Sequence, residues 1–398
     1  MIHHKKLLTS IITNGNTNND SNFSDGMKNR FLLIFIISCI CLNAFAQKKI
    51  TDWKSAFSYA DKTWMNSKQA EILVATILKY QAPNGGWSKN QDWLNTIDPK
   101  SFEKFGRKVT DTTFDNNATT REIEFLIKYY VDRKESASPT QLIAVKAAVN
   151  RGVDFIFNAQ YDNGGWPQYF PFLMPRKAVD YTSHITFNDH VMLNIMTLLK
   201  KIIYQQDEFK EFGFEPQIQA KALNAFNKGI DCIVKCQIVK NGVPTVWCQQ
   251  HDAKTFMPAS ARDFEPAAFN AAHETAYLLL FLMKLQNPDD KLKRCIYYAV
   301  RWIEQHKIKG RTTEKFVNRQ GKNDLREIKQ KGKDTWARFY DLKTEKPVFF
   351  EKDGKLKNNF NELEYDRRNG YSWLDPSPQK AIDYYYNTWI KKYPIYTK

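Results

Sequence analysis

The chain has 398 residues and a formal net charge of +16, with 59 Lys and Arg against 43 Asp and Glu. Its length and a hydrophobic content of 42% support a sizeable core, which excludes a small fold that depends on disulfides for stability. The excess of positive charge favours polyanionic partners, namely nucleic acid, anionic lipid or acidic polysaccharide.

The N-terminal segment has the pattern of a targeting sequence. Residues 1–26 are polar and Asn-rich, and we interpret them as a non-native or mis-assigned leader, with Met27 as the true start. Residues 27–46 combine a basic start, an apolar run over 31–42 and a small-x-small end, which is typical of a secretory signal peptide. Because the apolar run is too short to span a bilayer, we predict a secreted or periplasmic protein without stable membrane insertion. Residues 48–398 are then expected to form a single domain.

Helix signals dominate the remaining chain. Ser138 precedes a Pro at a first helical position, and Thr119 begins a capping box with Glu122. Apolar residues at helical spacing predict helices at 67–80, 123–126, 139–156, 191–204, 217–236, 267–286, 289–306 and 378–392. Strand signals are few, and the clearest is a short hairpin at 348–357 with Asp-Gly at its centre. The Lys-rich stretch 291–333 is interpreted as a solvated face.

The chain also repeats itself. A helical pattern ending in Gln is followed by a Gly turn and then Trp at three places, over residues 78–87, 157–166 and 233–247. The period of roughly 80 residues fits two helices and their loops, and such units stack or close on themselves. We therefore predict an all-α fold, an α/α toroid built from about three helix-pair repeats with short β-hairpin and loop excursions. The Gly turns are expected to line one rim, where loops can carry function.

Four cysteines follow the predicted signal peptide: Cys232, Cys236, Cys248 and Cys295. Cys232 and Cys236 are spaced to lie on one face of a helix, and no paired His follows at zinc-site spacing. We interpret all four as packing residues, and one disulfide among them is compatible with an exported chain.

Polar and ionic residues gather after several predicted helix ends. These segments are 115–116, 188–190, 249–252, 261–266, 336–340 and 366–371. Each has an ordinary structural explanation: Asp115 as a turn residue, Asp189 as a helix N-cap, and Arg262 as the partner of a nearby acid. His251 and Asp252 suggest an acid–base pair, but adjacent side chains seldom face each other. The sequence shows no phosphate loop, no His-Glu-x-x-His and no Gly-x-Ser-x-Gly.

Taken together in their order, these segments resemble the pectate lyases of polysaccharide lyase family 10. The resemblance spans roughly residues 60–395 and depends on several spaced motifs: Asn-Gly-Gly-Trp-Ser-Lys-Asn (84–90), Asp-Asn (115–116), Asn-Gly-Gly-Trp-Pro-Gln (163–168), Asn-Asp-His-Val-Met (188–192), Trp-Cys-Gln-Gln-His-Asp (247–252), Pro-x-x-Ala-Arg (258–262), Ala-Arg-Phe-Tyr-Asp (337–341) and Arg-Arg-x-Gly-Tyr-x-Trp (367–373). It implies an α/α toroid and a secreted enzyme that cleaves de-esterified polygalacturonate by calcium-assisted β-elimination, giving 4,5-unsaturated oligogalacturonides. The chain would then act as a monomer on an acidic polysaccharide, with no role for nucleic acid.

The resemblance also implies roles for individual residues. Arg262 would be the base, although an Arg pKa above 12 would not by itself suggest that role. Asp115 would belong to the catalytic centre and Asp189 would be a calcium ligand. Arg338 would bind a uronate carboxylate. The remaining candidates for substrate binding are Lys89, Asn116, Lys352 and Arg368.

Two features leave alternatives open. Lys352 stands where the family pattern has Arg, and Lys keeps the charge but loses the planar fork that grips a carboxylate. A catalytically weakened or non-catalytic binder of acidic glycans is therefore one alternative. A glycoside hydrolase is another, because Asp115 and Asp189 could serve as the two carboxylic acids that glycoside hydrolysis needs.

Overall fold

The computed structural model describes residues 49–95, 97, 100, 108, 110–173, 181–262 and 264–395. The predicted leader and signal peptide, residues 1–46, lie outside the described residues and stay predictions. Residues Thr51–Lys398 form one unit by their internal contacts. Among the described helices, none has the length and apolarity needed to cross a membrane.

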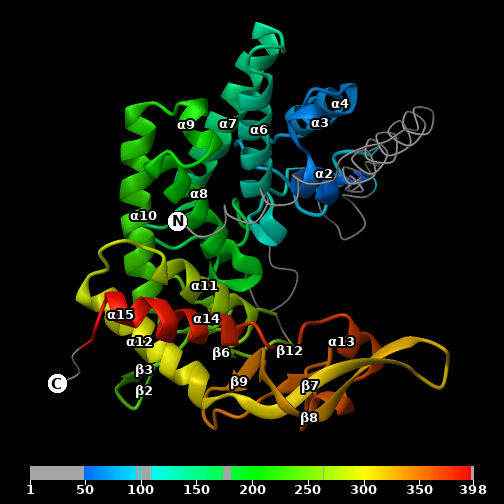
Figure 1. Ribbon diagram of the computed structural model, residues 1–398, viewed down its shortest axis with the longest axis vertical. Coiled ribbons are helices and arrows are strands. Elements are labelled where there is room, and N and C mark those ends of the chain that lie inside the picture. The colour runs from blue at the N-terminus through cyan, green and yellow to red at the C-terminus, as the bar shows by residue number, and fades with distance from the viewer. Residues whose placement is uncertain are drawn as a thin grey trace, which may run out of the picture. The chain divides into compact units, whose positions relative to one another are not determined.

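Most of the predicted helices are present, and their starts follow from local sequence. The Ser138 hydroxyl accepts a hydrogen bond from the backbone N–H of Gln141, and Pro139 opens α7 as predicted. The described helices are α2 (Trp53–Tyr59), α3 (Lys62–Met65), α4 (Lys68–Lys79), α6 (Thr120–Arg133), α7 (Pro139–Ala159), α8 (Val191–Tyr204), α9 (Glu208–Phe212), α10 (Pro216–Cys236), α11 (His273–Met283), α12 (Asp290–Gln305), α13 (Tyr365–Asn369), α14 (Pro378–Tyr384) and α15 (Ile390–Lys392) (Figure 1).

The start of α6 differs from the prediction. Thr119 is the N-cap, but its backbone φ is +66° and its side chain makes no capping hydrogen bond. The Thr119 hydroxyl instead accepts from the backbone N–H of Trp87 at 3.0 Å and donates to the carbonyl of Thr113 at 2.9 Å. The predicted capping box is therefore wrong, because a long-range contact with the first Gly-Trp turn takes the hydroxyl.

The repeat is built by one set of contacts used several times. The indole N–H of Trp87, Trp166 and Trp247 donates to a carbonyl of the preceding helix, at Ile77, Ile156 and Ile233 respectively. The Gln that ends each helix donates to its own turn and to the next helix of the set, which links α4 to α7, α7 to α10, and α10 to α12. Trp336 makes the same indole contact with Ile303 of α12. A fourth unit therefore follows the three that the sequence predicts.

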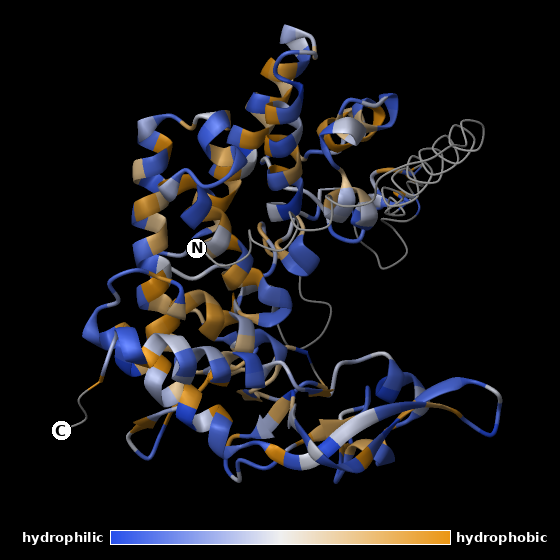
Figure 2. Ribbon diagram, in the orientation of Figure 1, coloured by the Kyte–Doolittle hydropathy of each residue, from blue (hydrophilic) through white to orange (hydrophobic). Residues whose placement is uncertain are grey.

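A second helix packs against three members of this set, α7, α10 and α12. α6 packs against α7, α8 against α10, and α11 against both α12 and α14. Polar residues accumulate in the segments that connect each of these Trp residues to the second helix of its repeat. Hydrophobic residues mark one side of the paired helices in Figure 2. This packing is what sets the positions of the interhelical segments.

Glycine is required where one repeat touches the next. Gly164 has φ +92°, and a Cβ at this position would lie 2.0 Å from the carbonyl oxygen of Lys228 in α10. We expect Gly164→Ala to lower the free energy of unfolding by about 1–2 kcal/mol through strain and by about 1–3 kcal/mol more through overlap. Gly213→Ala is the matched control, because Gly213 also has positive φ but has open space around its Cβ position. Urea unfolding of both variants checks this, and equal losses would contradict the overlap argument.

The all-α prediction is wrong. Strands β1–β12 form five small sheets in the described residues, with orders β1-β4-β5, β12-β8-β7, β2-β3, β6-β9 and β10-β11. Their bounds are β1 (Ile185–Thr186), β2 (Val239–Lys240), β3 (Val243–Pro244), β4 (Gln250–His251), β5 (Pro258–Ala259), β6 (Ala268–Asn270), β7 (Ile308–Val317), β8 (Asn323–Ala337), β9 (Phe339–Asp341), β10 (Phe349–Phe350), β11 (Leu356–Lys357) and β12 (Leu374–Asp375). The predicted hairpin at 348–357 is present as β10 and β11.

The longest strands lie in the Lys-rich stretch that was interpreted as a solvated face. β7 and β8 pair antiparallel and form the two-stranded ribbon of Figure 1. Charged residues there hide the strand signal, because no residue of β7 and few residues of β8 are buried, so apolar residues do not alternate with polar ones. With these sheets present, the predicted α/α toroid with only short β excursions is also incorrect.

The four cysteines are buried and free. Cys232 Sγ and Cys236 Sγ lie 4.0 Å apart along one face of α10, well beyond the length of a disulfide bond. The packing interpretation is confirmed, and no disulfide joins them in the structure.

Candidate active site

Two polar turns come together between the paired helices. Asp115–Asn117 and Asn188–His190 are both short 3₁₀ turns, each preceded by a Phe and followed by a helix, and they pack against each other. Asn116 and Asp189 both have positive φ, at 53° and 50°. Non-Gly residues in this region are uncommon and are associated with functional sites. A third equivalent, Phe269-Asn270, ends β6 just before α11, and its buried side-chain amide has no hydrogen-bond partner among the described residues.

Asp115 has a buried carboxylate of which one oxygen is paired and the other is not, among the described residues. Its Oδ2 forms an ion pair with the ammonium of Lys89, which follows the first Gly-Trp turn. Its Oδ1 is buried and has no hydrogen-bond partner among the described residues. An unsatisfied buried carboxylate oxygen is costly, so the atom is suited to a ligand that the protein alone does not supply.

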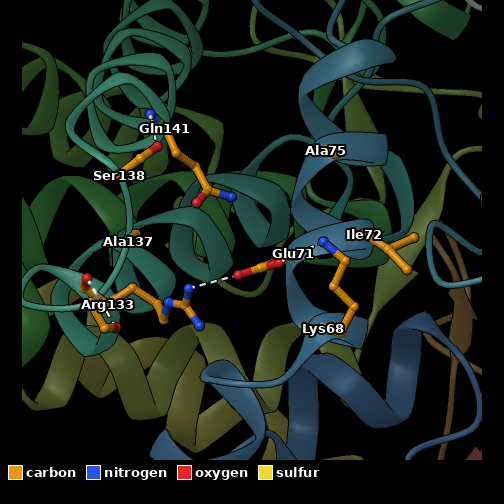
Figure 3. A pocket seen from close by; sticks show the side chains of 9 residues that line it. Lys68, Glu71, Ile72, Ala75, Arg133, Ala137, Ser138 and Gln141 are labelled. Atoms are coloured by element: carbon orange, nitrogen blue, oxygen red, sulfur yellow. Dashed lines mark hydrogen bonds and ion pairs between the residues drawn. The ribbon is translucent and has the colours of Figure 1, made fainter.

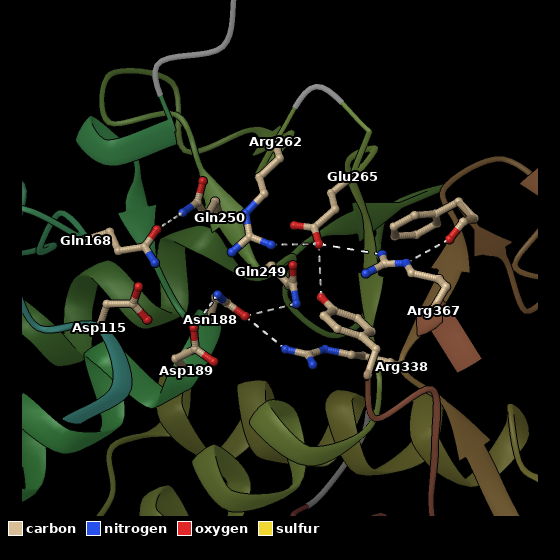
Figure 4. A network of polar contacts seen from close by, with 12 residues as sticks. Asp115, Gln168, Asn188, Asp189, Gln249, Gln250, Arg262, Glu265, Arg338 and Arg367 are labelled. Atoms are coloured by element: carbon tan, nitrogen blue, oxygen red, sulfur yellow. Dashed lines mark hydrogen bonds and ion pairs between the residues drawn. The ribbon is translucent and has the colours of Figure 1, made fainter. Parts of the chain in front are cut away.

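Asp189 does not cap α8, so its ordinary structural explanation is wrong. The N-cap of α8 is His190, and no side chain makes a capping hydrogen bond there. The Asp189 carboxylate accepts a local hydrogen bond from the Asn188 amide at 2.8 Å. Figure 4 shows the carboxylates of Asp115 and Asp189 beside each other on neighbouring turns.

Arg338 is held at the centre of the network. It is buried, and its Nη2 forms an ion pair with Glu274 and donates to Asn188 Oδ1 at 2.9 Å. The guanidinium also lies 4.5 Å from the ring centre of Tyr371. Burial acts to lower the pKa of Arg338, but the surrounding negative charges, led by Glu274, together outweigh it, so this pKa lies above its ordinary value. Arg338 is therefore a permanent, fixed positive charge.

Arg262 lies on the other side of the same network (Figure 4). Its side chain is 39% exposed, and Nη1 lies 3.3 Å from Oε1 of Glu265. Glu265 is only 2% exposed and also contacts Arg367 Nη2 at 3.7 Å and the Tyr371 hydroxyl at 3.2 Å. The expected ion pair of Arg262 is thus confirmed for Glu265, whereas Asp263 lies outside the described residues.

The surroundings of Arg262 oppose easy loss of its proton. Burial acts to lower the pKa of Arg262, but the surrounding negative charges, led by Glu265, together outweigh it and raise the pKa above its ordinary value. Tyr371, Tyr181 and Asp189 act in the same direction. A base at this position therefore needs additional positive charge nearby, of the kind that a bound cation supplies.

The structure separates two adjacent arginines of the Arg-Arg run. Arg367 points into the site, buried among the rings of Phe264, Phe350, Tyr371 and Trp373. Arg368 points away and forms a two-pronged ion pair with the buried Asp324 of β8, at 2.9 and 2.7 Å. The pairing lowers the pKa of Asp324 well below its usual range. The structure therefore does not bring Arg368 into the network.

The other predicted residues have clear positions. Lys89 is in the network through Asp115, and Asn116 is at its edge, where its amide donates to Asn90 Oδ1 at 2.9 Å. Lys352 is exposed in the turn between β10 and β11. No contact described here joins Lys352 to the arginines of the site.

The His251–Asp252 pair is structural. His251 is fully buried, accepts from the backbone N–H of Cys248 at 3.0 Å, and is 2.8 Å from the carbonyl of Phe256. Burial lowers the pKa of His251 to about 4, so it is neutral near pH 7. Asp252 accepts from Lys254 and Thr255 within its own turn. The two side chains therefore have separate tasks and do not act as an acid–base pair.

Sequence reasoning missed four residues that hold this site together. Asn188, Glu265, Glu274 and Arg367 are all buried and polar, and each contacts one of the site arginines or shares their acid partner. All but Glu274 lie inside the polar segments that the sequence marks, but their roles depend on partners far along the chain. Glu274 sits within a helical pattern, where nothing local signals its burial.

The carboxylates of the site can supply part of the oxygen ligands that calcium needs. Among the described residues, no group of three or more His, Cys, Asp or Glu side chains could hold a metal by itself. Ca²⁺ takes about 6–8 oxygen ligands, some of which can be water or substrate. The unpaired Oδ1 of Asp115 and the lightly bonded carboxylate of Asp189 fit a partial site of this kind, which a carboxylated substrate would complete.

A second hollow lies away from this network, between α4 and the segment that joins α6 to α7 (Figure 3). Its charged residues satisfy one another: Glu71 pairs with Lys68 at 3.0 Å and with Arg133 at 2.8 Å. These contacts join the first two repeats. The hollow is therefore a structural seam between repeats, and the arginine and carboxylate network is the candidate active site.

Known proteins of one enzyme family resemble this chain. The sequence model of the pectic acid lyase family matches residues 81–382. A family 10 polysaccharide lyase from Cellvibrio cellulosa is similar at 28% identity and a TM-score of 0.67, over 82% of this chain and 95% of its own. An Asp-to-Ala mutant of family 10 polysaccharide lyase from the same organism, in complex with trigalacturonic acid, shows 27% identity and a TM-score of 0.68 over 82% and 96%. No curated protein compared with the chain matches it.

Proposed function

The chain belongs to the pectic acid lyase family, as a polysaccharide lyase of family 10, and on that premise we propose that it cleaves polygalacturonate by β-elimination with Arg262 as the base. The observation that carries the proposal is the placement of two carboxylates, Asp115 and Asp189, opposite the guanidinium of Arg262. The complex of the similar lyase with trigalacturonic acid supports galacturonate as the substrate unit.

The reaction requires removal of a weakly acidic proton. Arg262 takes the proton from carbon 5 of the sugar, the electron pair forms a double bond to carbon 4, and the bond from carbon 4 to the glycosidic oxygen breaks. The departing oxygen then takes a proton from solvent. The products are a new reducing end and a 4,5-unsaturated uronide. The difficulty is the negative charge that develops beside a carboxylate already carrying one.

Fixed positive charge answers that difficulty. Arg338 is a permanent cation, oriented by Glu274 and Asn188, and it favours a uronate carboxylate near the network. Calcium, when bound, neutralises the uronate carboxylate and lowers the cost of charge at carbon 5. Asp115 and Asp189 would hold it, and Lys89 keeps the Asp115 carboxylate in position. These charges also act to lower the pKa of Arg262 in the substrate complex.

We expect digestion of polygalacturonate to produce the ultraviolet absorbance of the unsaturated uronide, with calcium present and at alkaline pH. A chelator should abolish the signal, and added calcium should restore it. Absorbance that persists at full strength with chelator would show that the reaction does not depend on calcium. New reducing ends without absorbance would mean hydrolysis, and binding without either product would mean a non-catalytic glycan binder.

Export fits this substrate, since polygalacturonate is an extracellular polymer too large to enter a cell intact. The proposal therefore includes secretion or delivery to the periplasm through the predicted signal peptide at 27–46, which lies outside the described residues. The formal charge of +16 favours association with an acidic polymer wherever the two meet.

A further inference from the structure

The β7–β8 hairpin is an insertion in the repeat. In the first two units, a short Gly turn connects the helix to its Trp, as between Ile77 and Trp87. In the fourth unit, β7 and β8 stand between the end of α12 at Gln305 and Trp336. The contact of Trp336 with α12 is the same as in the other units, so the repeat does not need the hairpin to close. We call residues 308–335 the basic arm.

The carboxylates of the basic arm are already engaged. Glu314 pairs with Arg326 at 2.7 Å, and Glu327 pairs with Arg311 at 3.6 Å, both across the two strands. Asp324 is taken by Arg368, and Asp334 lies 3.6 Å from Lys307. Two of these acids brace the arm internally and two pair with residues outside it, so none of these ion pairs neutralises the remaining cations of the arm.

Three exposed lysines are left on β8 without an acidic partner. Lys329, Lys331 and Lys333 are exposed, and no ion pair is found for any of them within the described residues. Arg311, although paired with Glu327, adds positive charge beside them, because it lies directly opposite Lys329. Like charges at such short spacing repel one another, and an anionic ligand would relieve that repulsion.

Lys331 and Lys333 lie in a β-bulge of β8. The register passes from Lys309 opposite Asp334 to Arg311 opposite Lys329, so residues 330–333 face only Gly310. Gly310 and Gly332 both have positive φ, at 66° and 79°, which lets the strand leave regular pairing here. Bulges of this kind redirect side chains and are usually retained for a purpose.

The basic arm leads directly into the active site. β8 ends at Ala337, immediately before Arg338, and β12 pairs with this end of the strand. Farther out, α13 contacts β8, and Arg368 and Asn369 hold Asp324 by hydrogen bonds at 2.7–2.9 Å. The arm is thus braced against the same α13 segment that sends Arg367 into the site.

We infer that the basic arm is a second binding surface for the polygalacturonate chain, outside the catalytic network, which captures long polymers. The identity of the polymer rests on the proposed function. The outer arm is largely hydrophilic in Figure 2, with Val317 as its exposed large apolar residue. A membrane-binding surface would need an apolar face as well, so the arm favours a soluble polyanion over a lipid surface.

The test replaces Lys329, Lys331 and Lys333 together by Gln and compares polygalacturonate with trigalacturonate as substrates. KM for the polymer should rise roughly 3- to 150-fold, the range expected for losing three exposed ion pairs. The salt dependence of that KM should weaken. Neither kcat nor the KM for trigalacturonate should change, because the short substrate does not reach the arm. A control triple, Lys221→Gln with Lys228→Gln and Lys291→Gln, removes the same charge from exposed positions on α10 and α12.

Each outcome is decisive. A polymer KM and salt dependence equal to those of wild type would overturn the inference and leave the arm a solvated face. An equal effect in the control triple would show that only net charge matters, which also overturns it. Sedimentation with anionic vesicles, lost in the Lys variant while polygalacturonate binding is kept, would assign the arm to lipid instead. If wild type forms no unsaturated product, the proposed function fails, and the polymer-binding comparison of the two triples still tests the arm.

Discussion

Replacing Arg262 by Ala is expected to lower kcat on polygalacturonate by roughly 10²- to 10⁴-fold, the usual contribution of a positioned general base. The loss should fall on kcat more than on KM, because the proton transfer occurs only in the transition state. Arg262 is 39% exposed, so its removal leaves no large buried cavity and the protein should stay folded. Initial rates of unsaturated product formation, with thermal unfolding measured in parallel, check this.

The neighbouring Arg368 serves as the matched control. Arg368→Ala leaves Asp324 buried without its ion pair, so the melting temperature should fall while kcat is largely kept. A variant of Arg262 with near wild-type kcat would rule out its role as base. Loss of kcat in the Arg368 variant, with the fold intact, would instead return Arg368 to the substrate-binding group.

Glu265→Gln tests the role of Arg262 through the direction in which the pH profile of kcat shifts. Glu265 stabilises the protonated form of Arg262, so removing its charge lowers the pKa of Arg262, and the alkaline rise of kcat should move to lower pH. The other titratable groups that act on Arg262 are Tyr371, Tyr181 and Asp189, and Arg367 adds a second positive charge. Gln keeps the hydrogen-bonding shape, so orientation is largely preserved. A profile that is unchanged, or that shifts to higher pH, would contradict a base at this position.

Asp189→Asn is expected to raise the calcium concentration needed for half-maximal activity by at least about 10- to 100-fold. Asn is the most specific substitution at this position, because it tolerates the positive φ of 50° and removes only the negative charge. Asp189 accepts from the Asn188 amide, a local contact that Asn can replace, so stability should change little. A calcium titration of activity, together with direct calcium binding in the presence of trigalacturonate, measures the effect.

Asp115 offers a contrast in the same experiment. Asp115→Asn should also weaken calcium dependence, but it leaves the ammonium of Lys89 without its ion pair and should lower the melting temperature as well. If both variants keep the wild-type calcium requirement, the two turns do not hold the cation. If only Asp115→Asn changes it, the unpaired Oδ1 of Asp115 is the main ligand.

Local patterns in the sequence determined much of this protein. Ser138-Pro139 predicts the start of α7, and the repeated Gln, Gly turn and Trp predict the units that the indole and Gln contacts build. The family resemblance is confirmed by the match over residues 81–382. These features are readable because caps, turns and helical spacing depend on residues within a few positions of one another.

Only the tertiary structure decided which polar residues meet. Arg367 and Arg368 are adjacent and chemically identical, yet one faces Glu265 and the other faces Asp324, because those acids approach from different segments of the fold. Thr119 has a perfect local capping pattern but bonds to Trp87 and Thr113 instead. The basic arm likewise shows no strand pattern, since pairing between β7 and β8, not burial, holds it. In each case the partner that decides the contact lies far away in the sequence. A local sequence pattern therefore cannot predict the interaction, which forms only when the chain is folded.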